Sequence, residues 1–104
     1  MTGLFTKKYH IAILDKEDGM LQQMVESIKT WYNKKVVVHV YNESRAMFES
    51  VNLNKIRNQP FDLAILDKSK IAEKMVLSHS NPDLKVIMCN DEKTLKDQTS
   101  SILL

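Results

Sequence analysis

Short apolar runs alternate along the chain with longer segments in which apolar residues recur at helical spacing. Four of these runs are bounded by charged or turn residues, which is typical of strands that are buried on both faces. The four strands are expected at residues 10–15, 36–40, 61–66 and 84–89. Because strands and helical segments alternate, the pattern predicts right-handed βαβ crossovers and a mostly parallel sheet in one α/β domain.

The segment after the first run predicts an amphipathic helix. Its apolar residues include Met20, Met24 and Ile28, which lie four positions apart and therefore on one helical face. Asp18 precedes them as a candidate N-cap, and the helix is expected to end near Asn33.

The later helical segments have less regular patterns. Asn42 or Ser44 is the candidate N-cap of a second helix, and Pro60 ends anything helical before the third strand. The remaining expected elements are a helical stretch at 71–77, a short polar helix at 91–98 and a brief strand at 101–104.

Length, charge and cysteine content exclude several classes of protein. The 104 residues are expected to form a single domain, 1–104, and a net charge of +2 over interspersed basic and acidic residues argues against nucleic-acid binding. No apolar run approaches the roughly 20 residues that span a bilayer, and residues 1–8 do not form a secretory signal. Cys89 is the only cysteine, which excludes an internal disulfide framework and favours a cytoplasmic location.

One pentapeptide, Ala-Ile-Leu-Asp-Lys, occurs twice and closes an apolar run each time. It places Asp15 and Asp67 at the carboxyl ends of the first and third predicted strands. In open α/β sheets, ligands bind at this edge, where the strand order reverses. If the two strands are neighbours, their backbones lie about 4.8 Å apart and both carboxylates reach one crevice.

These segments resemble a known family. Residues 10–15, 60–67 and 82–88 are similar to the first, third and fourth strand regions of a response-regulator receiver domain. Residues 61–67 carry the best match, Phe-Asp-Leu-x-x-Leu-Asp. The resemblance implies a flavodoxin-like three-layer sandwich with a parallel sheet of four to five strands in the order 2-1-3-4-(5).

The resemblance also implies roles for individual residues. Asp67 matches the aspartate that accepts a phosphoryl group in this family, and Asn90 stands at the position of the switch hydroxyl. The Mg²⁺ ion that such chemistry requires would be held by Asp15, Glu17, Asp67 and Ser69. The expected partner is a sensor kinase or another signalling protein, and the domain itself is not expected to be an enzyme.

Several residues depart from the family pattern. Lys16 replaces the second acidic residue after the first strand, so its ammonium is a candidate replacement for the cation. It would offset a repulsion of roughly 1–4 kcal/mol between two carboxylates about 4 Å apart. Lys68-Ser69-Lys70 replaces the family's Pro- and Gly-containing loop, and no residue matches the family's lysine after a fifth strand. The sequence therefore predicts a pseudo-receiver that acts through protein contacts, with impaired or absent phosphotransfer at Asp67.

Two alternative functions stay open at this point: a working phospho-accepting receiver that uses Mg²⁺, and a flavodoxin-like small-molecule binder. Simpler structural interpretations also exist. Asp67 can be a strand-end residue neutralised by Lys16 or Lys68, Asn90 can cap the next helix, and Cys89 can be a buried thiol. The uncovered flank beyond the fourth strand predicts a homodimer or a contact with another protein.

Two further groups of residues are interpreted as structural. His10, His39 and His79 lack the spacing of metal ligands with one another or with Cys89, so we interpret them as ordinary surface or strand histidines. The six methionines follow helical spacing, which is typical of residues that fill a core.

Overall fold

Four parallel strands form one sheet in the order β2-β1-β3-β4. The computed structural model describes residues 8–15, 19–32 and 35–103. The strands are β1 (Lys8–Leu14), β2 (Lys35–Tyr41), β3 (Leu63–Leu66) and β4 (Lys85–Met88). β1 lies between β2 and β3, with Ala12 opposite Ala64 across the β1–β3 pair. This order confirms the predicted α/β, flavodoxin-like fold class. Among the described residues the sheet has four strands, the lower of the two numbers expected.

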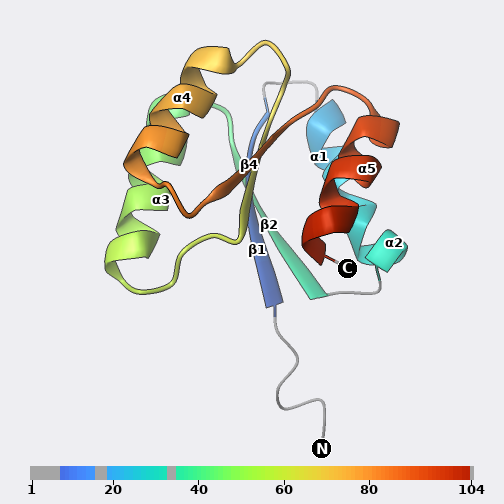
Figure 1. The fold of residues 1–104 in the computed structure, drawn as a ribbon, viewed down its shortest axis with the longest axis horizontal. Helices are drawn as coiled ribbons and strands as arrows, with labels where there is room; N and C mark the ends of the chain where they lie inside the picture. The colour runs from blue at the N-terminus through green and yellow to red at the C-terminus, as the bar shows by residue number, and fades with distance from the viewer. Residues whose placement is uncertain (1–7, 16–18, 33–34, 104) are drawn as a thin grey trace, which may run out of the picture.

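Helices cover both faces of the sheet (Figure 1). One face carries α1 (Met20–Glu26), α2 (Ile28–Tyr32) and α5 (Glu92–Leu103), and the other carries α3 (Ser44–Ile56) and α4 (Ile71–Ser80). Strand residues alternate between two cores: Ile11 and Ile13 belong to the first, and Ala12 and Leu14 to the second. No described helix is long and apolar enough to cross a membrane.

The first predicted helix is divided in two at Ser27. The Ser27 amide donates to the Met24 carbonyl over 3.1 Å, and the Ser27 carbonyl accepts from the Trp31 amide over 3.0 Å as α2 begins. Gly19 occupies the N-cap position of α1 with φ 69°, a left-handed conformation that glycine adopts at little cost. The candidate cap Asp18, like Asn33, lies outside the described residues.

The second predicted helix, α3, does not use either candidate cap. Glu43 occupies the N-cap position, and no side-chain hydrogen bond closes the helix start. The Ser44 hydroxyl instead donates to the Glu73 carboxylate over 2.9 Å. Ser44 therefore joins α3 to α4. A capping rule considers only neighbours in the sequence, so it does not predict this contact.

The C-terminal segment differs most from expectation. Residues 92–103 form one continuous helix, so the predicted strand at 101–104 is wrong for its described part. Leu95 and Thr99 are fully buried, and Ile102 packs against the first core. Because these side chains recur at helical spacing, α5 covers the sheet face beside α1 instead of adding a strand next to β4.

His10 and His39 form a pair that their sequence positions did not reveal. His10 Nδ1 and His39 Nε2 lie 3.1 Å apart in hydrogen-bonding geometry, joining β1 to β2. The two rings share a surface hollow with Lys8 and Asp62. Both residues lie on strands, as one of the two interpretations had it, and among the described residues no group of three metal-ligating side chains is found; their pairing is the new finding.

This pair predicts a loss of stability in mild acid. Burial, followed by the charge of His10, lowers the pKa of His39 below its ordinary value. The unfolded chain therefore binds more protons than the folded chain as the pH falls through about 6.5, and the free energy of unfolding should decrease there. We expect His39→Gln to flatten this pH dependence, measured by urea unfolding between pH 5 and 8. Equal slopes in the natural chain and in His39→Gln would contradict this prediction.

Candidate functional site

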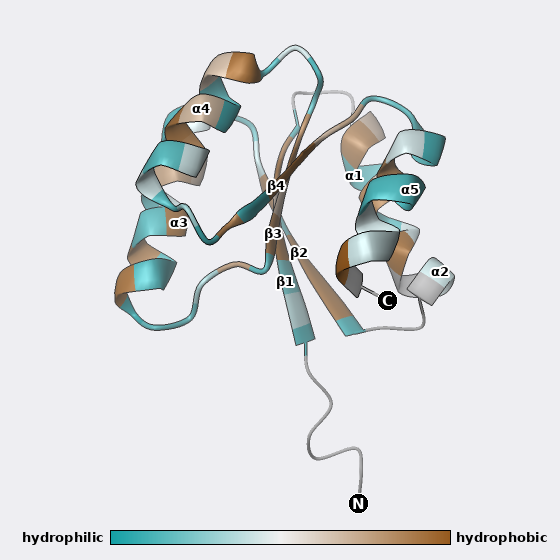
Figure 2. Ribbon diagram, viewed as in Figure 1, coloured by the Kyte–Doolittle hydropathy of each residue, from teal (hydrophilic) through white to brown (hydrophobic). Residues whose placement is uncertain are grey.

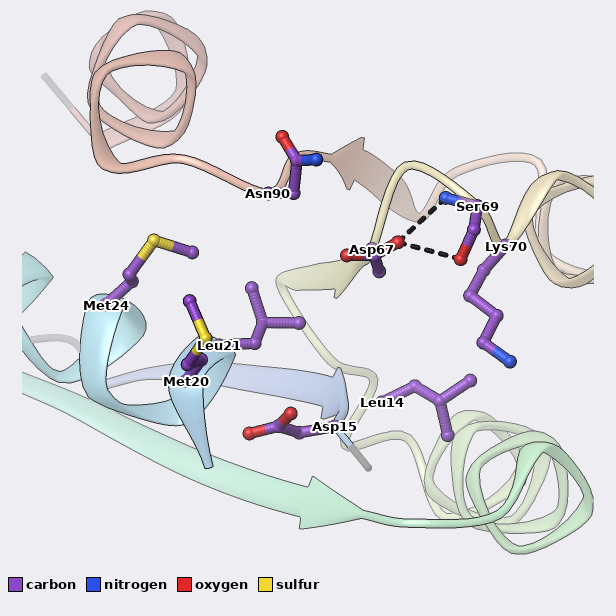
Figure 3. A pocket seen from close by; sticks show the side chains of 9 residues that line it. All are labelled: Leu14, Asp15, Met20, Leu21, Met24, Asp67, Ser69, Lys70 and Asn90. Carbon is purple, nitrogen blue, oxygen red and sulfur yellow. Dashed lines mark hydrogen bonds between the residues drawn. The ribbon is translucent and has the colours of Figure 1, made fainter. Parts of the chain in front are cut away.

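The carboxyl ends of β1, β3 and β4 meet at one edge of the sheet. Asp15 directly follows β1 and Asp67 directly follows β3. Asn90 follows β4 after one intervening residue, Cys89. All three line one cavity of about 390 Å³, shown in Figure 3. The structure therefore brings the two aspartates of the repeated pentapeptide to a common pocket. Among the described residues, those that line it are Leu14, Asp15, Met20, Leu21, Met24, Asp67, Ser69, Lys70 and Asn90.

Asp15 is a buried carboxylate held at the start of α1. Its side chain is only 6% exposed, and one oxygen accepts the backbone N–H of Gln22 over 3.0 Å. Its own backbone N–H donates to the Tyr41 carbonyl over 2.9 Å, which extends the β1–β2 ladder by one residue. An anion beside the exposed amides of a helix start is favourably placed, because those amides lack intrahelical acceptors.

Asp67 is engaged by the loop that follows it. Its Oδ2 atom accepts two hydrogen bonds from Ser69, one from the backbone N–H over 2.9 Å and one from the hydroxyl over 2.7 Å. The Asp67 carbonyl accepts the Lys70 amide over 3.0 Å. Together these bonds close the turn that leads into α4, which is the type of local structure that Asp and Ser favour.

The two carboxylates do not point at each other. Figure 3 shows the Asp15 carboxylate directed along the α1 side of the pocket and the Asp67 carboxylate turned toward Ser69. Each carboxylate therefore has its own donors, the Gln22 amide for Asp15 and the Ser69 amide and hydroxyl for Asp67. Backbone and hydroxyl donors thus contribute to stabilising the charge of both carboxylates.

The lysines near the site have different partners from those expected. The Lys68 ammonium lies 3.8 Å from an oxygen of Asp91, so of the two lysines considered as partners of Asp67, Lys68 pairs with Asp91 instead. Lys70, which sequence reasoning missed, lines the pocket and places its ammonium 3.8 Å from Glu73. Its position three residues after Asp67 could have indicated that Lys70 lies at the same pocket. Lys16 and Glu17 lie outside the described residues.

The polar residues that follow β4 have different roles from those that the sequence predicted. Asn90 is exposed and lines the pocket, while the cap of α5 is the next residue. Asp91 accepts the Thr94 amide over 2.7 Å and the Thr94 hydroxyl over 2.9 Å, and these bonds lower the pKa of Asp91. The interpretation of Asn90 as the cap was wrong. Cys89 is fully buried, which confirms the buried-thiol interpretation.

Part of the pocket wall is apolar and was not expected. Met20, Leu21 and Met24 from α1 line it opposite Asp67 and Asn90 (Figure 3). Met20 is 60% exposed, so the interpretation of the methionines as core residues fails for it. The sequence showed the helical spacing of these residues. It did not show that one side of α1 faces the pocket.

Comparison of the chain with protein-family models, with curated proteins and with solved structures found no match. The chemistry of the pocket is therefore the basis for inferring a function. Mg²⁺ usually takes one or two protein carboxylates together with water and phosphate oxygens, and Asp15 and Asp67 supply that minimum at one pocket. Among the described residues, no third acidic, histidine or cysteine side chain joins them in a metal-binding group.

Proposed function

We propose that this chain is a receiver-like signal-transduction domain that acts through protein contacts and in which phosphotransfer at Asp67 is impaired. The observation that carries the proposal is the meeting of Asp15, Asp67 and Asn90 in one pocket at the carboxyl edge of a 2-1-3-4 sheet. A ligand at this edge would contact loops from three strands at once. The pocket is therefore suited to coupling a bound group to the helices that these loops begin.

The hydrogen bonds of Asp67 support impairment. Attack on a phosphoryl donor requires a carboxylate oxygen with a free lone pair directed into the pocket. Here one oxygen accepts two donors from Ser69. Bound Mg²⁺ would supply charge neutralisation for the incoming group, and Lys16, if it occupies that position, competes with the ion. Attack through Oδ2 would require the Ser69 bonds to break, and Mg²⁺ binding would require such a lysine to move.

The proposal predicts the response of the site to a phosphoryl mimic. We expect millimolar Mg²⁺ with beryllofluoride to leave the amide NMR signals near Asp15, Asp67 and Asn90 unchanged in the natural chain. We expect Lys16→Asp to bind Mg²⁺ more tightly and to gain a response at those signals, because it removes the competing cation and adds an oxygen ligand.

The control is Lys16→Asp combined with Asp67→Asn, which should abolish the gained response. A response in the natural chain that Asp67→Asn removes would overturn the impairment and favour the alternative of a working phospho-accepting receiver. Lys16→Asp without any gain in Mg²⁺ affinity would show that this lysine does not take the place of the cation.

The apolar wall favours a second candidate function, the binding of a small molecule. A cavity of about 390 Å³ with apolar and polar lining lies within the size range of ligand pockets. The methyl signals of Met20 and Met24 distinguish the two candidates. A small molecule held in the pocket would shift these methyl signals without Mg²⁺, whereas a phosphoryl mimic acts first on Asp67 and depends on the ion.

A further inference from the structure

Helix α4 carries its apolar residues on the wrong side for a helix that covers a sheet. Ile71 is 61% exposed, Met75 is 67% exposed and Val76 is 45% exposed. Leu77 is the only fully buried residue of the helix. A helix that packs on a core normally turns its apolar stripe inward and its charged residues outward. Figure 2 shows brown, apolar colour in the first turn of α4 as well as along the strands.

A charged pair at the start of α4 lies on the inner side of the helix. Lys70, which precedes the helix, and Glu73 have side chains that are only 21% and 19% exposed, and their charged groups lie 3.8 Å apart. Glu73 also accepts the Ser44 hydroxyl from α3. The one acidic residue of α4 therefore faces the body of the protein. The outward side is formed by Ile71, Ala72, Met75 and Val76, which we call the α4 face.

The α4 face forms a continuous strip. Its residues lie at positions i, i+1, i+4 and i+5, so they are neighbours along one side of the helix. Contiguous exposed apolar surface of this kind marks interaction sites on soluble proteins. Met75 also departs from the interpretation of the methionines as core residues, and exposed methionine is common on surfaces that accept helices.

The rim of the α4 face is basic. The exposed ionisable residues on α4 itself are Lys74 and His79. Lys55 from α3 reaches the end of α4, where its ammonium donates to the Ser80 carbonyl over 3.2 Å. Lys68 lies just before the helix start with a half-exposed side chain. Positive charge thus lies beside the strip at Lys74 and beyond its C-terminal end at Lys55, while Lys68 near its N-terminal end is paired with Asp91.

The charge around the α4 face distinguishes between two possible binding partners, a second copy of this chain and another protein. In a two-fold contact between copies of this chain, the face would pack on itself and bring Lys74 close to its own copy. A partner with acidic residues beside an apolar stripe would instead pair with the lysines and bury Ile71 and Met75. The strip covers residues 71–76, the first part of the ten-residue helix α4, and presents side chains into which the ridges of a second helix could pack.

We infer that the α4 face docks an amphipathic helix of another protein, with an apolar stripe flanked by Asp and Glu. This inference rests on the proposed function, since it names the partner chemistry for a domain that acts through protein contacts. The face begins at Ile71, directly after the loop in which Ser69 holds Asp67. The docked helix would therefore lie beside the candidate pocket.

The test uses the full chain and two synthetic helices of about 18 residues, long enough to hold helical structure. Both have the same Leu and Ala stripe, one flanked by Glu and the other by Lys. We expect the Glu helix to shift the amide signals of residues 71–79 and to bind at least tenfold more tightly than the Lys helix. Met75→Glu should weaken binding of the Glu helix at least tenfold, and Lys74→Glu should reverse the preference between the two helices.

Ile56→Glu is the matched control, because Ile56 is 81% exposed on α3 and lies outside the α4 face. It should bind the Glu helix like the natural chain. Equal binding of both helices, or amide shifts confined to other elements, would overturn the inference. Sedimentation showing a dimer that Met75→Glu dissociates would overturn it too, in favour of a second copy. The beryllofluoride experiment does not involve this face, so a failure here leaves the proposed function standing.

Discussion

Replacement of Leu95 by alanine is expected to lower the free energy of unfolding by about 2–5 kcal/mol. Leu95 is fully buried in the first core, which includes Ile11, Val25 and Ile87. Removal of its side chain leaves a cavity between α5 and the sheet, and the surrounding residues relax only partly into it. Urea unfolding followed by circular dichroism measures the change.

Gln98→Ala is the matched control for this prediction. Gln98 is exposed on the same helix, so its replacement should change the stability by less than about 0.5 kcal/mol. A Leu95→Ala protein as stable as the control would mean that α5 does not cover the sheet in solution. The arrangement of the C-terminal segment would then need to be revised.

The Cys89 thiol is expected to react about a hundredfold more slowly with a thiol reagent at pH 8 than the same thiol in the unfolded chain. Burial, with smaller contributions from Asp91 and Asp67, raises the pKa of Cys89 to about 11. Only the thiolate reacts, and its fraction at pH 8 falls by about a factor of ten for each unit by which the pKa rises. Absorbance assays with an aromatic disulfide measure both rates.

Urea provides the control for the thiol reaction, because unfolding exposes the same cysteine and should restore an ordinary rate. The folded rate should also rise in Leu95→Ala, since opening of the first core exposes Cys89 more often. A folded rate equal to that in urea would show that Cys89 is accessible, contrary to its burial beside β4.

Parts of the structure were predictable because they depend on local patterns. Asp15 and Asp67 each follow a strand that is an apolar run, as burial on both faces of a sheet requires. Because the strands are parallel, both carboxylates lie at the same edge of the sheet. The common pocket of the two aspartates followed from strand order alone. The bonds from Ser69 to Asp67 did not, because many residues near an aspartate could supply such donors.

Other parts depend on interactions that the apolar pattern does not reveal. Thr99 is polar, yet it is fully buried, and its hydroxyl donates to the Leu95 carbonyl over 2.7 Å within α5. This bond satisfies the hydroxyl locally, so the helix continues through a segment rich in Ser and Thr. His10 and His39 meet only through the β1–β2 register, in which His39 lies opposite Ala12 and therefore diagonal to His10.

The turn closed by Ser69 has a thermodynamic consequence. It joins Asp67 in the pocket to the first residue of α4, so a molecule that draws the carboxylate away from Ser69 also changes how that helix begins. If both proposed sites are occupied, linkage requires reciprocity: a ligand in the pocket would change the affinity of α4 for the docked protein by the same factor by which that protein would change the affinity of the pocket for the ligand. Even without a phosphoryl group, the domain would in this way couple ligand binding in the pocket to protein binding at α4.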